Sequence, residues 1–249
     1  MVNCGAAMYI APVGVVNACD PKAAYDEAIA FAQGHQESFG LEAAGAFAAA
    51  VAAAFTPGIS IEEIVERVIA LSKDGTREAI RAIADVASRL KGADHAEVVA
   101  AFHAAIAPFS PMGDDVNHTK ARAGRLTMAY QPSRLGSIEE LPLALGFALV
   151  NGGDFRTAIE DGINSGRDTD SIGVMAGAIL GALHGESVID AADRATLDSA
   201  NRFDLTAAAD RFTATTTDIL LADRRAREAA ERSRDSLLAD LPTASVVNL

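Results

Sequence analysis

Apolar residues recur along this chain at intervals of three and four positions, the spacing that lines one face of an α-helix. The clearest such segment follows Ser60, and its apolar face consists of Ile61, Ile64, Val65, Val68 and Leu71. Ser60 and Glu63 stand at the two positions of a capping box, in which each side chain accepts a hydrogen bond from the other residue's backbone amide. The pattern therefore predicts a helix that begins directly after Ser60.

Similar signals predict helices along most of the remaining chain. Asp20 and Pro21 are typical of a helix start, and Gly34 is typical of a helix end. Further helical segments are expected at about 77–90, 95–107, 138–150, 155–164, 172–184 and 205–239. The alanine-rich run AAGAFAAAVAAAF (43–55) predicts a buried helix that is too short to span a bilayer. Since no alternating strand pattern is visible, we expect an all-α orthogonal multi-helix bundle, with 108–132 as its longest irregular connection.

Composition limits the class of protein. The 249 residues, half of them apolar, suffice for the core of one large domain. The 34 acidic and 21 basic residues give a formal charge of −13, which disfavours binding to nucleic acid or to an anionic membrane. The amino terminus has no secretory signal pattern, and Cys4 and Cys19 form neither a disulfide framework nor a zinc-ligand spacing. We therefore expect a cytoplasmic protein with reduced thiols and with neither nucleic acid nor membrane as a partner.

The chain changes character near residue 205. Beyond it lies the charge-rich stretch DILLADRRAREAAERSRDSLLADL, which has apolar residues at its two ends and few between them. We expect a core over 1–205, followed by a carboxy-terminal helix and tail over 206–249. A solvated helix that closes the domain and a helix that binds a partner are both compatible with this pattern.

The candidate chemistry lies in NSGRDTDSIGVMAGAILGALHG (164–185), where Asp168, Asp170 and Ser171 precede an apolar run. Such residues cap helices, because their side chains accept hydrogen bonds from the free amides of a first turn. The same oxygen donors also suit Mg²⁺ or another hard divalent cation. Glycine then recurs every four residues, at Gly173, Gly177, Gly181 and Gly185. This stripe predicts close packing of a deeply buried helix, and two carboxylates beside such a helix favour a compensating cation.

Three segments together resemble the ADP-ribosylglycohydrolase family. GRDTDSIGVMAGAILGALHG is similar to the family's Gly-Gly-Asp-Thr-Asp-Thr/Ser motif and the glycine-rich helix that follows it. CGAAMYIAPVG (4–14) is similar to its Gly-Ala-Ala-Met-Arg loop, and GHQESFG (34–40) to its histidine-containing segment. Their order and separation fit the family over about residues 1–205.

The resemblance implies an all-α hydrolase that releases ADP-ribose from a modified protein or a small-molecule acceptor. It implies a binuclear Mg²⁺ or Mn²⁺ centre that positions the ribose and is bound by Asp168, Asp170 and Ser171. A loop whose backbone approaches the sugar and diphosphate corresponds to Cys4, Gly5 and Ala6, and a substrate-pocket histidine corresponds to His35. The acidic group that activates water is not assigned to a residue of this chain.

The sequence departs from the family pattern in three ways. Tyr9 replaces the arginine of the loop, and Arg167 replaces the second glycine before the first metal aspartate. The chain also begins at the loop, whereas family members have a preceding Ser/Thr-Asp-Asp motif and an upstream carboxylate. From this we expect the isolated chain to have little or no activity, unless an upstream segment or a partner chain supplies these groups. Asp114 and Asp115 are a weaker alternative source, since a solvated turn explains the pair.

Three functions remain open on the sequence. The first is the metal-dependent ADP-ribosyl hydrolase, in which a carboxylate activates water against an oxocarbenium-like transition state. The second is a catalytically impaired relative that binds ADP-ribose or has a structural role on the same scaffold. The third is an all-α isoprenoid synthase, which the single acidic pair at Asp114 and the scarcity of aromatic residues disfavour.

Overall fold

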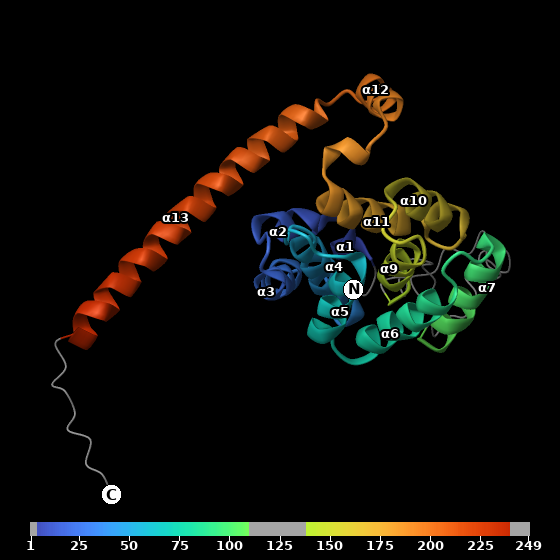
Figure 1. Cartoon of the computed structure of the whole chain (residues 1–249), viewed down its shortest axis with the longest axis horizontal. Helices are drawn as coiled ribbons and strands as arrows, with labels where there is room; N and C mark the ends of the chain where they lie inside the picture. The colour runs from blue at the N-terminus through green and yellow to red at the C-terminus, as the bar shows by residue number, and fades with distance from the viewer. Residues whose placement is uncertain (1–3, 110–137, 240–249) are drawn as a thin grey trace, which may run out of the picture. The chain divides into compact units, whose positions relative to one another are not determined.

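A computed structural model describes residues 4–109 and 138–239 of the chain, and within these ranges every regular element is a helix (Figure 1). The all-α class is therefore confirmed. The elements are α1 (Gly5–Tyr9), α2 (Ala11–Val16), α3 (Pro21–Ala32), α4 (Phe39–Ala54), α5 (Ile61–Leu71), α6 (Asp74–Arg89), α7 (His95–Ile106), η1 (Ala107–Phe109), α9 (Glu140–Val150), α10 (Phe155–Asn164), α11 (Thr169–His184), η4 (Glu186–Val188), α12 (Ala191–Ala200) and α13 (Leu205–Ala239). Asp114, Asp115 and nearly all of the expected irregular connection lie outside the described residues.

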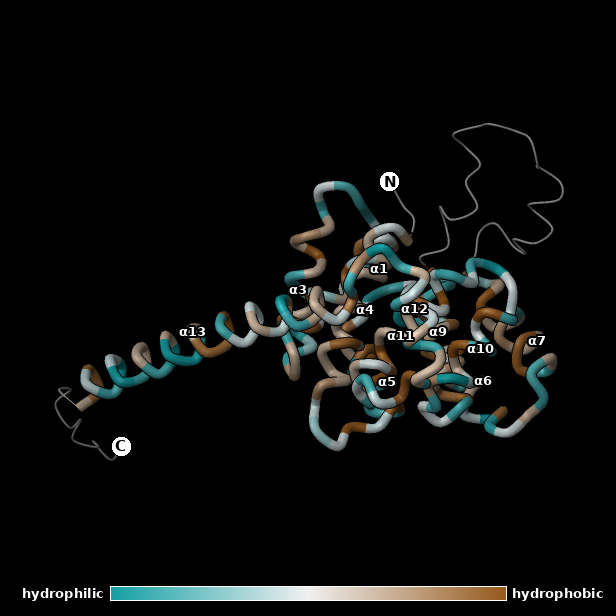
Figure 2. Tube along the Cα trace, turned by 90° about the horizontal axis from the view of Figure 1, so that it is seen from above, coloured by the Kyte–Doolittle hydropathy of each residue, from teal (hydrophilic) through white to brown (hydrophobic). Residues whose placement is uncertain are grey.

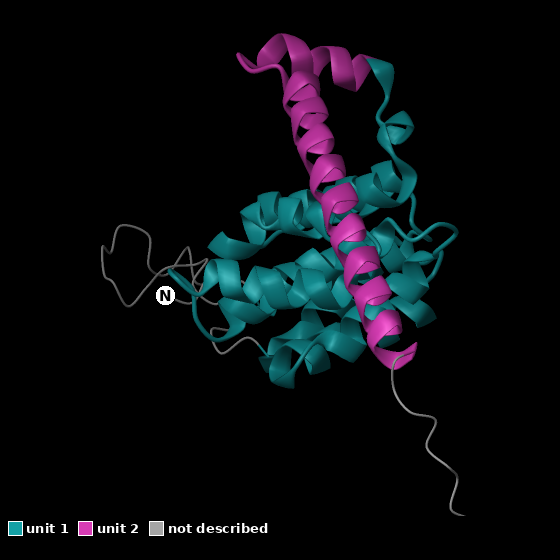
Figure 3. Cartoon of the chain, turned by 90° about the vertical axis from the view of Figure 1, so that its left-hand side faces the viewer, with its two compact units in different colours: residues 1–191 teal, residues 192–249 magenta. Residues whose placement is uncertain are grey.

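The chain forms two compact units, residues 1–191 and residues 192–249 (Figure 3). The first unit contains the helices from α1 to α11, and the second contains α13 and nearly all of α12. The division at residue 205, which was expected from the change in composition there and from the extent of the family resemblance, stays a prediction.

Local capping explains where several helices begin. Asp20 accepts a hydrogen bond from the backbone amide of Ala23 at 3.0 Å and thereby caps α3. At α5 both halves of the predicted capping box are present, between Ser60 and Glu63. These caps satisfy backbone amides that have no partner within the helix, so the sequence alone defines both helix starts.

The core of the first unit is built around α4 and α9, whose side chains are buried on almost every side. Helix α4 contacts α1, α2, α3, α5 and α11, whereas α9 contacts α6, α10 and α11. Alanine and glycine make this close approach possible. A Cβ atom on Gly14 of α2 would lie 2.6 Å from the backbone oxygen of Ala48 in α4. Helix α11 contacts both central helices, so residues at its ends are held by the core.

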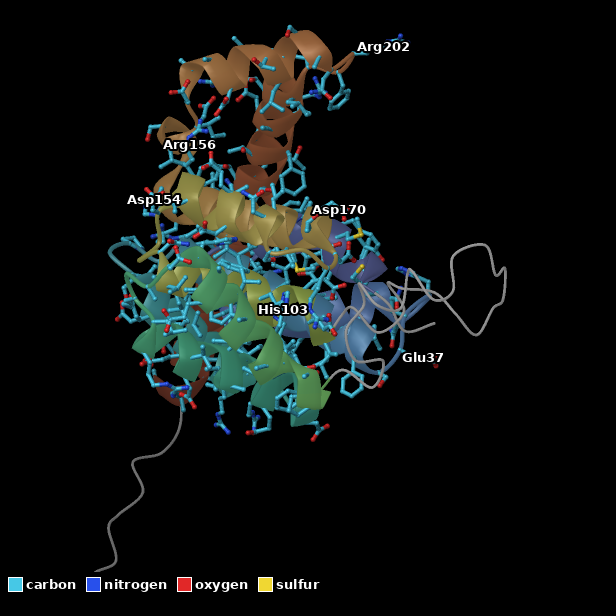
Figure 4. The ribbon with its side chains drawn as sticks, turned by 90° about the vertical axis from the view of Figure 1, so that its right-hand side faces the viewer. Glu37, His103, Asp154, Arg156, Asp170 and Arg202 are labelled. Carbon is cyan, nitrogen blue, oxygen red and sulfur yellow. The ribbon has the colours of Figure 1, made fainter. Side chains whose placement is uncertain are left out.

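The glycine stripe of α11 faces α10. Cβ atoms added at Gly173, Gly177 and Gly181 would lie 3.1, 3.4 and 3.9 Å from side-chain atoms of Ile163, Ile159 and Phe155, respectively. The two helices are therefore antiparallel, and Figure 4 accordingly labels Asp170 and Asp154 at opposite ends of the pair. The close neighbours are side chains rather than another backbone. Gly185, expected in the stripe, instead follows the helix with a backbone φ of 78°.

In the second unit, α13 is exposed along almost its entire length, and Thr216 is its one buried residue. Hydrophilic and hydrophobic segments alternate along it (Figure 2). Its large exposed apolar residues are Leu205, Phe212, Ile219, Leu220, Leu221, Leu237 and Leu238. Among the described helices, including this one, none combines the length and the apolar character needed to cross a bilayer.

Candidate functional site

The structure brings the amino-terminal loop to the start of α11. Cys4 directly precedes α1, which contacts both α4 and α11. The Cys4 thiol donates to Oδ2 of Asp168 at 3.5 Å, and its Sγ lies 3.7 Å from Oγ of Ser171. Cys4 and Ser171 are buried, whereas Asp168 is half-buried. Two segments from opposite ends of the first unit thus meet through three of the predicted site residues.

The two aspartates of the Asp-Thr-Asp motif lie in different environments. Asp168 occupies the cap position of α11, yet its side chain makes no capping hydrogen bond. Asp170 is exposed in the first turn of α11, where Asp168 and the backbone amides of that turn lower its pKa. Capping therefore does not account for Asp168, whose carboxylate instead accepts from Cys4.

Glu140 adds a carboxylate that the sequence-based prediction missed. It is the first residue of α9, it is 1% exposed, and neither of its carboxylate oxygens has a hydrogen-bond partner among the described residues. Single ligand atoms of Cys4, Glu140 and Asp168 all lie within 4.8 Å of one another. A buried carboxylate without a partner carries a large desolvation cost, so this site is one that a cation would stabilise.

The acid–base properties of the cluster follow from burial and from like charges. Burial, and then the neighbouring Asp168, raises the pKa of Glu140 well above its ordinary range. Burial, and then the charge of Glu140, raises the pKa of the Cys4 thiol to about 12. Burial and Asp170 raise the pKa of Asp168, whereas a hydrogen bond with Asp168 lowers the pKa of Asp170. The surroundings therefore favour protonated groups here, and a cation would favour the ionised forms instead.

A buried ion pair lies next to this cluster. Nη1 of Arg167 is 2.9 Å from Oε2 of Glu139, and both side chains are almost fully buried. Arg167 has a backbone φ of 68°, in the left-handed region that favours glycine. This conformation gives a physical reason for the glycine that the family motif has at this position. In this chain the ion pair with Glu139 holds an arginine there instead.

The other predicted substrate-binding residues lie on or beside α1. Gly5 begins this helix, and Ala6 in its first turn is fully buried. The Tyr9 hydroxyl lies 3.1 Å from Nδ1 and 3.0 Å from Nε2 of His35, and the two rings are stacked with centroids 5.5 Å apart. The exposed Phe31 contacts Tyr9 edge-on. His35 is thus held beside the loop by the residue that replaces the family's arginine.

A signal for Glu140 was present in the sequence. Glu139 and Glu140 directly precede LPLALGFALV, an apolar run without a polar face. A helix that is apolar all round is buried, so a glutamate in its first turn must be buried with it. The sequence does not indicate that Glu139 is paired with Arg167 while Glu140 is unpaired, because both contacts are made by distant segments.

Comparison with known proteins gives one family. The family model for ADP-ribosylglycohydrolase matches residues 1–228. The uncharacterized protein YegU of Escherichia coli (strain K12) is 43% identical over 68 residues, which cover 27% of this chain and 20% of YegU. The similarity to that curated relative therefore extends over only a fifth of its length. No solved structure matches the chain.

Proposed function

The chain belongs to the ADP-ribosylglycohydrolase family, and on that premise we propose that it hydrolyses the glycosidic bond of an ADP-ribosyl group. The products are free ADP-ribose and the unmodified acceptor, which is a protein or a small molecule. The family match supports hydrolysis of ADP-ribose linkages as the class of reaction. The requirement for Mg²⁺ or Mn²⁺ and the choice of acceptor are further parts of the proposal.

The contact between Cys4 and Asp168 is the observation that supports the proposed hydrolase most directly. These residues belong to the two separate motifs that resemble the family, and their side chains meet at 3.5 Å. A loop that approaches the sugar and diphosphate must lie beside the residues that hold the ribose. Contact between the two motifs is what this arrangement requires.

The residues present fit a divalent cation. Asp168 makes no capping hydrogen bond, so its carboxylate is available as a ligand, and Ser171 offers a buried hydroxyl next to it. The neighbouring Asp170 would complete the set implied by the family resemblance. A hard cation held by these residues would supply electrostatic stabilisation of the developing charge and would orient the ribose hydroxyl groups.

The remaining roles belong to the chain itself. The amides and small side chains of Gly5 and Ala6 let the backbone approach the sugar and diphosphate closely. His35, between α3 and α4, is held beside α1 by Tyr9 and would contact the substrate from there. No residue is assigned here as the base that activates water.

A relative that binds ADP-ribose without turnover is the second candidate. It is favoured by Tyr9, whose hydroxyl group contacts His35 at the position where the family has an arginine. This substitution removes a positive charge from the loop. The two candidates predict the same ligand but differ in turnover, so one experiment separates them.

The experiment measures release of ADP-ribose by mass spectrometry from mono-ADP-ribosylated proteins and small molecules, with Mg²⁺, with Mn²⁺ and with a chelator. Binding of ADP-ribose is measured in parallel by calorimetry. Asp168→Asn should lower cation-dependent turnover by about 10²-fold or more, because the loss of several kcal/mol of electrostatic stabilisation costs that much. Asp85→Asn, an exposed aspartate in α6, is the matched control and should leave it unchanged.

Three outcomes are distinguished. Turnover that is lost with the chelator and in Asp168→Asn supports the hydrolase. Binding of ADP-ribose without turnover, itself weakened by Asp168→Asn, supports the second candidate. Absence of both binding and turnover with every acceptor overturns the proposal.

A further inference from the structure

Glu140 has no role in the proposed function, yet it is the most deeply buried carboxylate of the cluster. Its carboxylate is buried at the start of α9 without a hydrogen-bond partner in the part of the chain that the structure describes. Buried carboxylates in folded proteins are otherwise paired, hydrogen-bonded or bound to metal. The groups closest to it among potential metal ligands are the Cys4 thiol and the Asp168 carboxylate. Neither the thiol nor the Asp168 carboxylate carries a positive charge, so neither compensates the charge of Glu140 when it is ionised.

The three donors differ in chemical type from the oxygen ligands that the family resemblance implies. Mg²⁺ and Mn²⁺ prefer oxygen donors, whereas thiolate sulfur favours zinc and other softer cations. One sulfur and two carboxylate oxygens make three protein ligands. Zinc sites that keep a fourth position open for water or a substrate have this number of protein ligands.

The separation of the donor atoms also suits zinc. With Zn–S of about 2.3 Å and Zn–O of about 2.0 Å, tetrahedral geometry places the sulfur and oxygen about 3.5 Å apart. Cys4 Sγ and Asp168 Oδ2 are 3.5 Å apart. The ligand atoms of all three residues lie within 4.8 Å of one another, so small side-chain shifts suffice to bring all three within bonding distance of one ion. A thiol hydrogen bond explains the contact between Cys4 and Asp168 but leaves Glu140 without a partner.

We propose that Cys4, Glu140 and Asp168 form a thiolate-containing binding site for Zn²⁺ or a similar thiophilic divalent cation. The inference rests on the proposed function at one point only: Asp168 also belongs to the cation site of the proposed hydrolase. On binding, the Cys4 thiol gives its proton to solvent, as does Glu140 where it is protonated, and both then coordinate the cation. The cation would link Cys4, directly before α1, to the starts of α9 and α11.

The test uses the intact chain, freed of metal and reduced, with Co²⁺ as a spectroscopic substitute for Zn²⁺. We expect a thiolate-to-cobalt charge-transfer band in the near ultraviolet at one equivalent, which Zn²⁺ abolishes and excess Mg²⁺ does not. Cys4→Ser should remove the band. Cys19→Ser is the matched control and should retain it, because Cys19 is free, exposed and bonded to the Phe55 carbonyl.

Glu140→Gln provides a second test that leaves the thiol intact. It should weaken Zn²⁺ binding by about 10²-fold or more, since loss of an outer-sphere partner alone costs 10–100-fold. In the wild type, Zn²⁺ should also raise the melting temperature, because it binds the folded chain preferentially. If Cys4→Ser does not fold, the wild-type band and the Glu140→Gln titration still decide the result.

The outcomes separate this inference from the proposed function. A wild-type chain that binds ADP-ribose with Mg²⁺ but shows no cobalt–thiolate band overturns the zinc site alone. A band that persists in Cys4→Ser, or zinc binding that Glu140→Gln does not weaken, also overturns it. A band without any binding of ADP-ribose or any turnover supports the zinc site and overturns the proposed function.

Discussion

The structure shifts the pKa of Asp154, beside the carboxyl end of α11, and the pKa values of Asp168 and Glu140, at its amino end, in opposite directions. At the carboxyl end, His184 donates from Nε2 to the Gly153 carbonyl oxygen at 2.8 Å, and the neighbouring Asp154 caps α10 by accepting from the Thr157 amide. The Thr157 hydrogen bonds lower the pKa of Asp154. At the amino end, burial raises the pKa of both Asp168 and Glu140. Figure 4 labels Asp154 and Asp170 at these two ends.

The direction of the pKa shift distinguishes carboxylates whose ionised form stabilises the fold from carboxylates whose ionised form destabilises it. A lowered carboxyl pKa means that the native structure stabilises the ionised form, and a raised pKa means that it disfavours it. The polar groups at the carboxyl end thus contribute to folding in the charged state. Asp168 and Glu140 at the amino end are held where their ionised forms are disfavoured, which is typical of binding and catalytic sites.

The largest expected effect concerns the buried ion pair between Arg167 and Glu139, beside the amino end of α11. Arg167→Ala should lower the free energy of unfolding by about 3–5 kcal/mol, because it leaves the buried Glu139 carboxylate without its cation. Arg167→Gly should be more stable than Arg167→Ala by about 1 kcal/mol, since glycine adopts a positive φ without steric cost. Urea denaturation at neutral pH measures both differences.

An exposed pair is the control for this prediction. Nη1 of Arg81 and Oε1 of Glu78 are also 2.9 Å apart, but both side chains are about half exposed. Arg81→Ala should cost at most about 1 kcal/mol, as is usual for surface pairs. Equal losses at the two arginines would contradict the role given to burial, and equal stability of the alanine and glycine variants at 167 would contradict the backbone strain.

A smaller effect is expected at the carboxyl end. Asp154→Ala should cost about 1 kcal/mol at neutral pH, because the Thr157 amide loses its acceptor. Since the folded-state pKa of Asp154 is lowered, its contribution is complete above the unfolded pKa of about 3.9 and is lost as the pH falls through the folded value. Unfolding measured from neutral pH to about pH 2 should show the variant and the wild type converging in acid. A deficit that stays constant over this range would show that packing, not the charged cap, is lost.

The helices were largely predictable because their signals are local. The expected segments 155–164 and 205–239 coincide with α10 and α13, and the capping box at Ser60 is formed as predicted. Helix α11 begins at Thr169 rather than Ile172, because its first turn includes the polar residues that precede the apolar run.

The candidate site was only partly predictable because its contacts are long-range. The meeting of Cys4 with Asp168 followed from two motifs considered together, although the functional roles of these residues stay predictions. Glu139 and Glu140 are identical neighbours in the sequence, yet one pairs with Arg167 and the other has an unpartnered carboxylate. Only the folded arrangement of α9 and α11 distinguishes them. The positive φ of Arg167 likewise cannot be deduced from the sequence, because arginine usually adopts a negative φ.

The smallest expected effect compares two glycines of the α11 stripe. A Cβ atom at Gly181, near the carboxyl end, would lie 3.9 Å from Phe155 Cε2, an ordinary contact, so Gly181→Ala should stabilise the chain by about 0.5–1 kcal/mol through helix propensity. At Gly173, near the amino end, the same atom would lie 3.1 Å from Ile163 Cγ1. Crowding there opposes the gain, so Gly173→Ala should be close to neutral. Urea denaturation of both variants provides the measurement. Equal stabilisation at the two positions would show that Ile163 of α10 moves aside without cost at the amino end of α11. The tight packing there would then not constrain the position of Asp168.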